Sequence, residues 1–163
     1  MGGILTLWNP QNGSIVDAEV TRNYLSAIIQ PMGMSETFLV TNVYGPQRID
    51  EKIRFLNSLV DLRSRHKEIP SVIGGDFNMI KYLLEKKGGT RILSRDSVEF
   101  NSFTEDMKMV EFKMKNGLFT WNNKRGGNAQ VASKLDRFLI SEKLMLTNSE
   151  ISASALPFGG SDH

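Results

Sequence analysis

The five residues Gly-Gly-Asp-Phe-Asn at positions 74 to 78 constrain the fold of this chain more than any other feature. They follow an apolar run at residues 69–73, which is typical of a buried strand. A strand that ends in two glycines can turn sharply, so we expect the side chains of Asp76 and Asn78 to emerge at the edge of a sheet. Side chains two positions apart on extended backbone point to the same side.

A carboxylate and a carboxamide at such an edge have a chemical use. Asp76 can bind a hard cation or activate a water molecule, and Asn78 can hydrogen-bond a phosphate oxygen. An Asx-type turn, in which both side chains bond only their own backbone, accounts for the same five residues. Other parts of the sequence must decide between the two interpretations.

The pattern of apolar residues along the chain predicts an α/β fold. Strands are expected at residues 3–8, 14–20, 24–30, 37–43, 69–73, 118–121, 135–140 and 151–156, and near Phe112. Helices are expected at residues 48–67, from Ser94 or Asp96 to Met109, and over a short segment from Ser141, with a long loop at residues 79–95. The first two strands form a hairpin that begins an antiparallel meander. This order predicts an α/β layered sandwich, with two packed, mostly antiparallel sheets and the helices outside them.

Length and composition exclude several classes of protein. The 163 residues predict one domain, residues 1–163. The sequence contains no cysteine, which excludes disulfides and a cysteine-bound metal. It contains only two histidines, which argues against a zinc site built from several histidines. No apolar run is long enough to cross a membrane, and the first residues lack the pattern of a signal peptide. An intracellular protein is expected, with nucleus and cytoplasm both open.

The net charge of +2 does not by itself indicate a nucleic-acid partner. A phosphate-binding face would have to come from local clusters of basic residues. The candidates are Lys86-Lys87 with Arg91 and Arg95, and the pair Lys124-Arg125. A solvated loop is the alternative interpretation of each cluster.

Three further motifs carry residues with chemical potential. Val43-Tyr44-Gly45-Pro46 places a tyrosine at the end of a strand, Lys134-Leu135-Asp136-Arg137 places an aspartate at the start of one, and Gly160-Ser161-Asp162-His163 ends the sequence. Taken singly, the tyrosine could be a packing residue, the first aspartate a strand-end cap, and the last motif a polar terminus.

Seven motifs in this order resemble the endonuclease/exonuclease/phosphatase superfamily, which has the DNase I-like fold. They are GGILTLWNP, VTNVYGP, VIGGDFNMI, EKKGG, LFTWNN, KLDRFLIS and GGSDH. The similarity extends over essentially the whole chain, and it is closest to the endonuclease domains of plant non-LTR retrotransposons.

The resemblance implies a catalytic role for five residues. Asp76 would orient or deprotonate the attacking water, and Asn78 would hold the scissile phosphate. The hydroxyl of Tyr44 would donate to a phosphate oxygen. His163 would contact the phosphate as its charge builds up, and Asp136 would hydrogen-bond this histidine and fix its tautomer.

The resemblance also implies a cofactor and a substrate. The metal would be Mg²⁺ or Mn²⁺, with Asp162, Asp76 and Asn78 as its site. Mg²⁺ prefers oxygen ligands and retains several waters, so one or two carboxylates can suffice. The implied function is a divalent-metal-dependent phosphodiester hydrolase, a DNA endonuclease of the retrotransposon type that contacts the phosphate backbone and no membrane.

The sequence departs from the superfamily pattern at both ends. Superfamily members begin with a strand that carries an asparagine and a later strand that carries a metal-binding glutamate, and they continue beyond the histidine. We therefore expect a truncated chain that self-associates through exposed sheet edges. The alternative function is a catalytically inactive module of the same fold that binds nucleic acid or a protein. A phosphatase for inositol phosphates or lipids ranks last.

Overall fold

The computed structural model describes residues 3–90, 92–115, 117–147 and 151–154. A six-stranded sheet in the order β1-β2-β3-β4-β9-β6 forms its centre, and a three-stranded sheet has the order β5-β8-β7. The strands are β1 Gly13–Val20, β2 Tyr24–Pro31, β3 Phe38–Tyr44, β4 Ser71–Asp76, β5 Lys86–Lys87, β6 Met109–Phe112, β7 Trp121–Asn122, β8 Ala132–Ser133 and β9 Asp136–Ser141. The helices are α1 Ile49–Arg65, α2 Arg95–Asp106, α3 Glu142–Thr147 and the short 3-10 helices η1 Leu83–Glu85 and η2 Gly127–Ala129. The predicted α/β class with two sheets is confirmed.

The pairing of strands in the large sheet is mostly antiparallel. Strands β1, β2 and β3 form the predicted meander, and β9 pairs antiparallel with both β4 and β6. Strand β4 pairs parallel with β3, because α1 carries the chain back across the sheet between them. The carboxyl ends of β3 and β4 therefore meet at one edge of the sheet.

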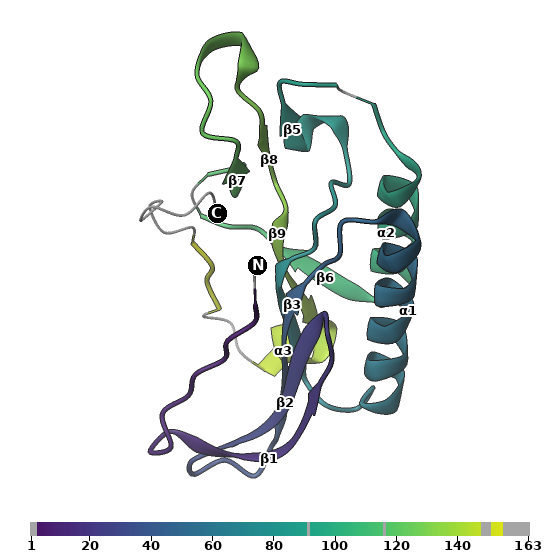
Figure 1. Ribbon diagram of the computed structural model, residues 1–163. Coiled ribbons are helices and arrows are strands. Elements are labelled where there is room, and N and C mark those ends of the chain that lie inside the picture. Colours follow the sequence, from purple (N-terminus) through teal and green to yellow (C-terminus); the bar gives the residue numbers. More distant parts are fainter. Residues whose placement is uncertain (1–2, 91, 116, 148–150, 155–163) are drawn as a thin grey trace.

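Helices α1 and α2 lie side by side on one face of the large sheet (Figure 1). Spacing of three and four residues brings Phe55, Leu59 and Leu62 of α1 to the same buried side. The residues of this core include Leu39, Val43, Phe55, Leu56, Leu59, Leu62, Ile73, Phe77, Phe100, Phe103 and Leu139. Burying each large apolar side chain contributes about 1.5–3 kcal/mol. Within the described ranges, no helix has both the length and the apolar character needed to cross a bilayer.

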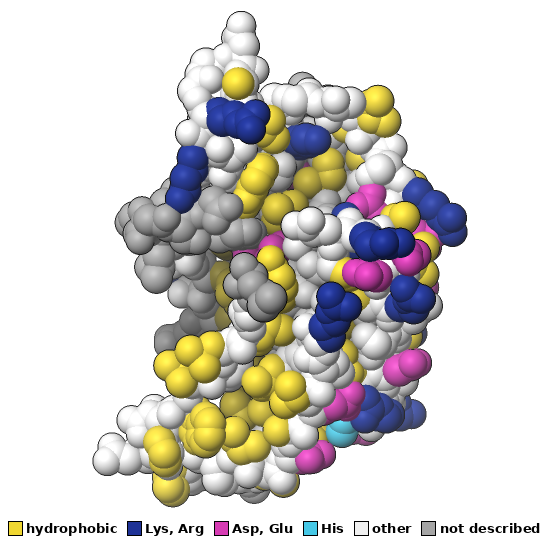
Figure 2. Space-filling model, in the orientation of Figure 1, with side chains coloured by type: hydrophobic (Ala, Val, Ile, Leu, Met, Phe, Trp, Pro, Cys, Tyr) yellow, Lys and Arg dark blue, Asp and Glu magenta, His cyan; other side chains and the backbone are white. Residues whose placement is uncertain are grey.

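The other face of the large sheet is less completely buried. Val20 is 73% exposed and Phe138 is 40% exposed. The segment at residues 3–8 lies on this side of the sheet (Figure 1), and the Asn42 side-chain amide donates to the carbonyl of Leu5 at 3.3 Å. Figure 2 shows apolar side chains gathered on the part of the surface that lies over β1 and β2.

The prediction of a strand at residues 3–8, paired in a hairpin with residues 14–20, is wrong. Strand β1 pairs with β2, and residues 3–8 belong to no strand. The turn before Tyr24 closes the β1–β2 hairpin, and in it the hydroxyl of Thr21 accepts the amides of Asn23 at 3.2 Å and Tyr24 at 3.0 Å. Residues 3–8 have no backbone ladder because they lie over the face of the sheet, where the carbonyl of Leu5 accepts the Asn42 side-chain amide, and not beside β1.

Several predicted boundaries also require correction. The predicted strand at 118–121 is wrong in its bounds, because the strand found there, β7, contains only Trp121 and Asn122. Residues 151–154 of the predicted last strand belong to no strand. Residues 155 and 156 lie outside the described residues. The predicted loop at 79–95 contains η1 and β5. Met109 is in β6 and not in α2, because Lys108 has a φ of 48° and ends the helical path.

The small sheet lies beyond the end of the large sheet at which β9 begins (Figure 1). Strands β7 and β8 pair antiparallel and are joined by η2. We call residues 121–133 the basic arm, because Lys124 and Arg125 are exposed near its tip. Asn123 braces the arm internally, since its side-chain amide donates to Ala129 at 2.8 Å and its carbonyl accepts the Val131 amide at 3.0 Å.

Candidate active site

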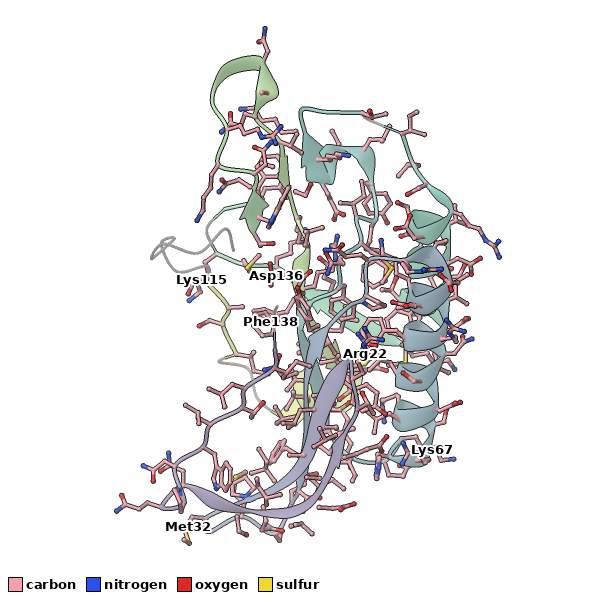
Figure 3. All side chains as sticks on the ribbon, in the orientation of Figure 1. Arg22, Met32, Lys67, Lys115, Asp136 and Phe138 are labelled. Atoms are coloured by element: carbon pink, nitrogen blue, oxygen red, sulfur yellow. The ribbon has the colours of Figure 1, made fainter. Side chains whose placement is uncertain are left out.

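Three of the predicted catalytic residues lie in one row across three neighbouring strands. Tyr44 is the register partner of Asp76 between β3 and β4, and Asp76 is the register partner of Asp136 between β4 and β9. Directly paired residues point to the same face of a sheet, with Cβ atoms about 4.5–5.5 Å apart in an antiparallel pair. Figure 3 shows Asp136 and Phe138 on the side of β9 that is turned away from α1 and α2. The fold therefore brings together residues that are 60 positions apart in the sequence, Asp76 and Asp136.

The turn after Asp76 fixes both predicted side chains of the Gly-Gly-Asp-Phe-Asn motif. One carboxylate oxygen of Asp76 accepts the backbone amide of Asn78 at 2.7 Å, so the Asx-type turn that the sequence left open is present. Asn78 has a φ of 54°, a conformation that asparagine tolerates better than most residues. Its side-chain amide donates to the carbonyl of Gly45 at 2.7 Å, and the Gly45 amide donates to the carbonyl of Asp76 at 2.6 Å. These bonds tie the ends of β3 and β4 together.

The glycine before Asp76 serves a different purpose from the predicted one. The sequence predicts a turn after the two glycines, but β4 continues through both of them to Asp76. Gly75 has a φ of +133°, and a Cβ atom there would lie 2.3 Å from the carbonyl oxygen of Val43. The position therefore requires glycine because the strand twists and approaches β3 closely.

Thr120 positions Asp136 and was not identified from the sequence. Its buried hydroxyl accepts the backbone amides of Leu135 at 3.0 Å and Asp136 at 2.9 Å. The carbonyl of Leu135 in turn accepts the amide of Phe77 at 2.9 Å, which links this segment to the turn after Asp76. The only sequence clue was the threonine between two aromatic residues in the motif LFTWNN.

A cluster of buried charges lies under the site, on the opposite face of β9. We call Arg137, Glu85, Glu111, Lys134 and Lys81 the Arg137 cluster. Arg137 is 1% exposed and donates to both carboxylate oxygens of Glu85, at 2.9 and 2.5 Å, and to Glu111 at 2.8 Å. Lys134 and Lys81 also pair with Glu111, the second at 3.7 Å. A basic residue inside the apolar strand segment DRFLIS, on the same face as Leu139, was the sequence clue to this cluster.

The carboxylates of this cluster have lowered pKa values. Burial raises the pKa of Glu85, but hydrogen bonding and attraction by Arg137 outweigh it, so the net shift of the pKa is downward. Burial likewise raises the pKa of Glu111, and the charges of Arg137 and Lys134 reverse that shift and lower the pKa. Both side chains are therefore ionised in the folded protein at neutral pH.

These lowered pKa values predict a loss of stability in acid. A carboxylate whose pKa is lower in the folded than in the unfolded chain stabilises the fold above its unfolded pKa, which is about 4.3 for glutamate. That contribution is lost as the pH falls below this value and through the lowered pKa of Glu85 and Glu111. We expect the melting temperature to be level from neutral pH down to about pH 5 and to fall steeply below about pH 4. Substituting Glu85→Gln should flatten the acid limb, and an unchanged limb in that variant would contradict the assignment.

The predicted metal ligands are only partly within the described residues. Asp162 lies outside them, as does the predicted catalytic residue His163. Among the residues that the structure describes, no group of three or more histidine, aspartate or glutamate side chains could hold a metal ion. The carboxylate of Asp76 and the carboxamide oxygen of Asn78 are nevertheless hard oxygen donors of the kind that Mg²⁺ prefers. The donor set therefore fits a hard divalent ion.

Two glutamates in or beside the antiparallel meander, Glu19 and Glu36, are held by partners outside the candidate site. Glu19 accepts the hydroxyl of Tyr24 and pairs with Arg65 at 2.7 Å. Glu36 lies 3.7 Å from the amino group of Lys143. Each carboxylate is engaged with partners outside the row of Tyr44, Asp76 and Asp136.

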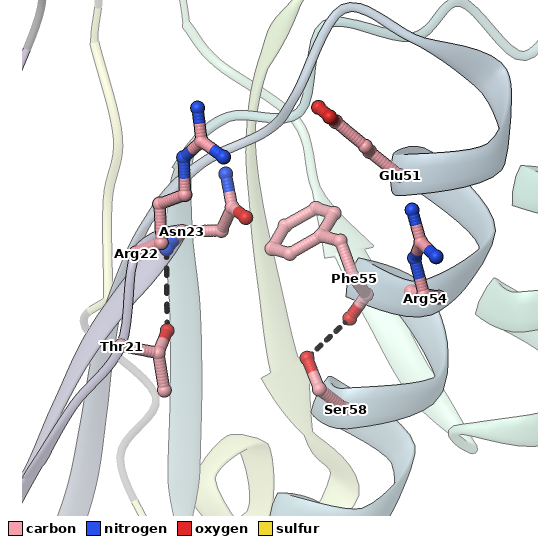
Figure 4. A pocket seen from close by; sticks show the side chains of 7 residues that line it. All are labelled: Thr21, Arg22, Asn23, Glu51, Arg54, Phe55 and Ser58. Carbon is pink, nitrogen blue, oxygen red and sulfur yellow. Dashed lines mark hydrogen bonds between the residues drawn. The ribbon is translucent and has the colours of Figure 1, made fainter.

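A pocket of about 300 Å³ lies between the β1–β2 turn and α1 (Figure 4). Arg22 and Asn23 come from the turn, and Glu51, Arg54 and Phe55 come from the helix. Asn23 connects the pocket to the candidate site, because its side-chain amide donates to the carbonyl of Tyr44 at 2.9 Å. Charges of both signs line this pocket, so its lining favours neither an anion nor a cation.

The fold is that of the DNase I-like proteins. Similar solved structures include the AP endonuclease LMAP from Leishmania major (TM-score 0.64, 15% identity, 87% of this chain and 52% of that chain). They also include the endonuclease domain of TRAS1, a telomere-specific non-LTR retrotransposon (TM-score 0.57, 15% identity, 77% and 53%). A third is D. rerio TDP2 complexed with single-strand DNA product (TM-score 0.52, 10% identity, 82% and 56%).

These similarities establish the fold alone, because none of the three identities exceeds 15%. The chain spans about half the length of the solved structures that it matches. No protein-family model and no curated protein matches the chain. The similar structures also include an endonuclease/exonuclease/phosphatase family protein from Bacteroides thetaiotaomicron (TM-score 0.56, 11% identity, 83% of this chain and 53% of that chain).

Proposed function

We propose that this protein is a divalent-metal-dependent phosphodiester hydrolase that nicks DNA. The observation that carries the proposal is the row of Tyr44, Asp76 and Asp136 at the ends of three neighbouring strands. Two paired carboxylates, a carboxamide and a phenol at one sheet edge supply a base, a cation site and neutral donors. Such groups favour hydrolysis of a phosphodiester, because its transition state carries more negative charge than the substrate.

Each residue has a proposed task. Asp76, oriented by its hydrogen bond from the Asn78 amide, holds or deprotonates the attacking water. Tyr44 and Asn78 donate hydrogen bonds to the scissile phosphate. Asp136 fixes the orientation of an imidazole that contacts this phosphate, and His163 is the proposed source of that imidazole.

The proposed metal is Mg²⁺ or Mn²⁺, held by Asp76, Asn78 and Asp162. When bound, such an ion neutralises developing charge and polarises the phosphate. The proposal for Asp162 rests on the resemblance of its motif, since this residue lies outside the described part of the chain. The proposal for Asp76 and Asn78 is supported by their positions at the end of β4 and in the turn that follows it.

DNA is the proposed substrate for two reasons. The names of LMAP and TRAS1 describe endonucleases, and the TDP2 structure contains single-strand DNA product. In addition, the sequence between Glu111 and Asp136 contains five basic residues and no acidic one. Two of these, Lys124 and Arg125, are exposed on the basic arm, and Figure 2 shows lysine and arginine side chains there. The retrotransposon type of endonuclease is proposed from the sequence motifs and from the similarity to TRAS1.

Neutralising the basic arm should weaken the salt dependence of DNA binding. Each phosphate contact contributes about 0.9 to the slope of log affinity against log salt concentration, so Arg125→Gln should lower the slope by about 0.9. The slope is measured by fluorescence anisotropy of a labelled duplex in EDTA at several KCl concentrations. Lys67→Gln is the matched control, because Lys67 is an exposed lysine just beyond the end of α1, distant from the arm (Figure 3). Equal effects of the two substitutions would show that the arm does not contact DNA.

The nuclease proposal is tested by conversion of supercoiled plasmid to open circles with Mg²⁺ and with EDTA. Nicking that requires the metal supports the proposal, and its absence overturns it in favour of a catalytically inactive DNA-binding module. DNA binding without nicking, measured in the same preparation, would identify it.

A further inference from the structure

We propose that Arg137 and Glu85 form a positioning pair, which holds the turn after Asp76 in register with the strand that carries Asp136. The proposal rests on the nuclease function proposed above. Neither residue reaches the substrate, because Arg137 is the register partner of Gly75 and its side chain lies on the helix-covered face of β9. The pair acts through the backbone to which the catalytic candidates are attached.

The first part of the argument is the geometry of Arg137. Both terminal nitrogens of its guanidinium donate to Glu85, one to each carboxylate oxygen, and this two-pronged contact fixes orientation as well as distance. The guanidinium carbon lies 5.3 Å from the centre of the Phe100 ring, so α2 supports it from the other side. The Nε atom is buried and has no hydrogen-bond partner among the described residues. A buried polar atom left without a partner is costly, and the two-pronged contact with Glu85 must offset that cost.

The second part is what Glu85 connects. Its carboxylate accepts the backbone amide of Lys81 at 2.6 Å, three residues after Asn78. Its backbone carbonyl accepts the amide of Lys134 at 2.9 Å, two residues before Asp136. Glu85 therefore connects the segment that follows Asn78 to the segment that precedes Asp136. Arg137, the residue next to Asp136, holds the carboxylate of Glu85.

The consequence is a closed frame around the candidate site. A hydrogen bond from the Phe77 amide to the Leu135 carbonyl connects these two segments directly. The buried pair of Arg137 and Glu85 connects them a second time. A displacement of about 1 Å between catalytic groups can cost about 100-fold in rate, so a frame that prevents it has a catalytic effect without touching substrate. Lysine cannot replace Arg137 here, because its ammonium is a point charge without the two-pronged fork.

The test removes the ion pair of Arg137 and Glu85 and keeps the net charge of the Arg137 cluster unchanged. The double variant Arg137→Met/Glu85→Gln deletes one positive and one negative charge, and neutral replacement of a buried ion pair is tolerated far better than loss of one partner. Amide hydrogen exchange is followed at Phe77 and Asn78, whose amides contact neither substituted side chain. We expect exchange there to rise about tenfold relative to α1, and kcat for nicking to fall about 100-fold with KM nearly unchanged.

A matched pair controls for general loss of stability. Lys52 and Asp96 form another ion pair with little exposure, and within the described residues it joins α1 to α2 without a hydrogen bond or ion pair to Glu85 or Arg137. The variant Lys52→Met/Asp96→Asn should lower the melting temperature and leave exchange at Phe77 and Asn78 unchanged relative to α1. If both double variants raise exchange uniformly along the chain, Arg137 is only a stabilising residue and the proposal is overturned.

Two further outcomes are decisive. If the Arg137→Met/Glu85→Gln protein fails to fold, Arg137→Lys takes its place, because it keeps the charge and loses only the fork. Folded Arg137→Lys with parental exchange and parental kcat overturns the proposal. If the parent itself does not nick DNA, the nuclease function fails, and the exchange at Phe77 and Asn78 alone decides whether Arg137 positions this turn.

Discussion

Replacing Asp76 by asparagine is expected to lower the rate of Mg²⁺-dependent nicking by about 10²–10⁴-fold, the usual contribution of a general base. Asparagine retains an oxygen that can accept the Asn78 amide, a bond of 2.7 Å in the parent. It loses the negative charge that attracts a cation and the basicity that activates water. The fold should survive while the chemistry is lost. The rate is measured as single-turnover formation of open circles from supercoiled plasmid.

Two comparisons make this result specific. Asp61→Asn is the control, because Asp61 is an exposed aspartate of α1 and its substitution should leave nicking unchanged. Asp136→Asn should lower the rate as well, since Asp136 is the register partner of Asp76. Nicking by Asp76→Asn at the parental rate would remove Asp76 from the site and would indicate a contaminating nuclease or another catalytic centre.

Replacing Phe77 by alanine is expected to destabilise the fold by about 3–5 kcal/mol. Phe77 is 0% exposed and lies between the rings of Phe55 and Phe100, with centroid distances of 6.2 and 5.1 Å. Its removal leaves a cavity between α1, α2 and the sheet. Because a domain of this size is stable by about 5–15 kcal/mol, the loss is a large fraction of the total. Urea unfolding followed by circular dichroism measures it.

The position of Phe77 gives this substitution a second effect. It stands between Asp76 and Asn78, so the core holds the catalytic turn in place from below. Val98→Ala is the control, because Val98 is 62% exposed on α2 and its truncation should change the stability by less than about 0.5 kcal/mol. A loss below about 1 kcal/mol for Phe77→Ala would mean that the aromatic cluster does not anchor the turn.

Local patterns in the sequence were sufficient for elements that depend on local physics. Apolar runs separated by the turn residues Pro31-Met32-Gly33 predicted the strands near residues 24–30 and 37–43, and spacing of three and four predicted α1. The pattern failed for residues 3–8, because an apolar run does not reveal whether a neighbouring strand is available for pairing. It also failed for the length of β4, since the close approach of Gly75 to Val43 is a contact between two strands.

The candidate site divides in the same way. Asp76, Asn78, Tyr44 and Asp136 were predicted from short motifs, because each motif places a polar side chain next to the start or the end of a strand. Thr120 and Arg137 were missed as site residues. Their partners, the amide of Asp136 and the carboxylate of Glu85, are distant in sequence, and no local pattern encodes such pairs.

The sequence by itself determined which chemical groups this protein has and in which order they follow the strands. Only the tertiary structure decided that Tyr44, Asp76 and Asp136 stand in one row, because the register of β3, β4 and β9 depends on how α1 and α2 pack on the sheet. The structure also decided that a basic residue could be buried at position 137. Burial of that charge is possible because residues 85 and 111 bring two carboxylates to it, and their approach is a property of the folded chain.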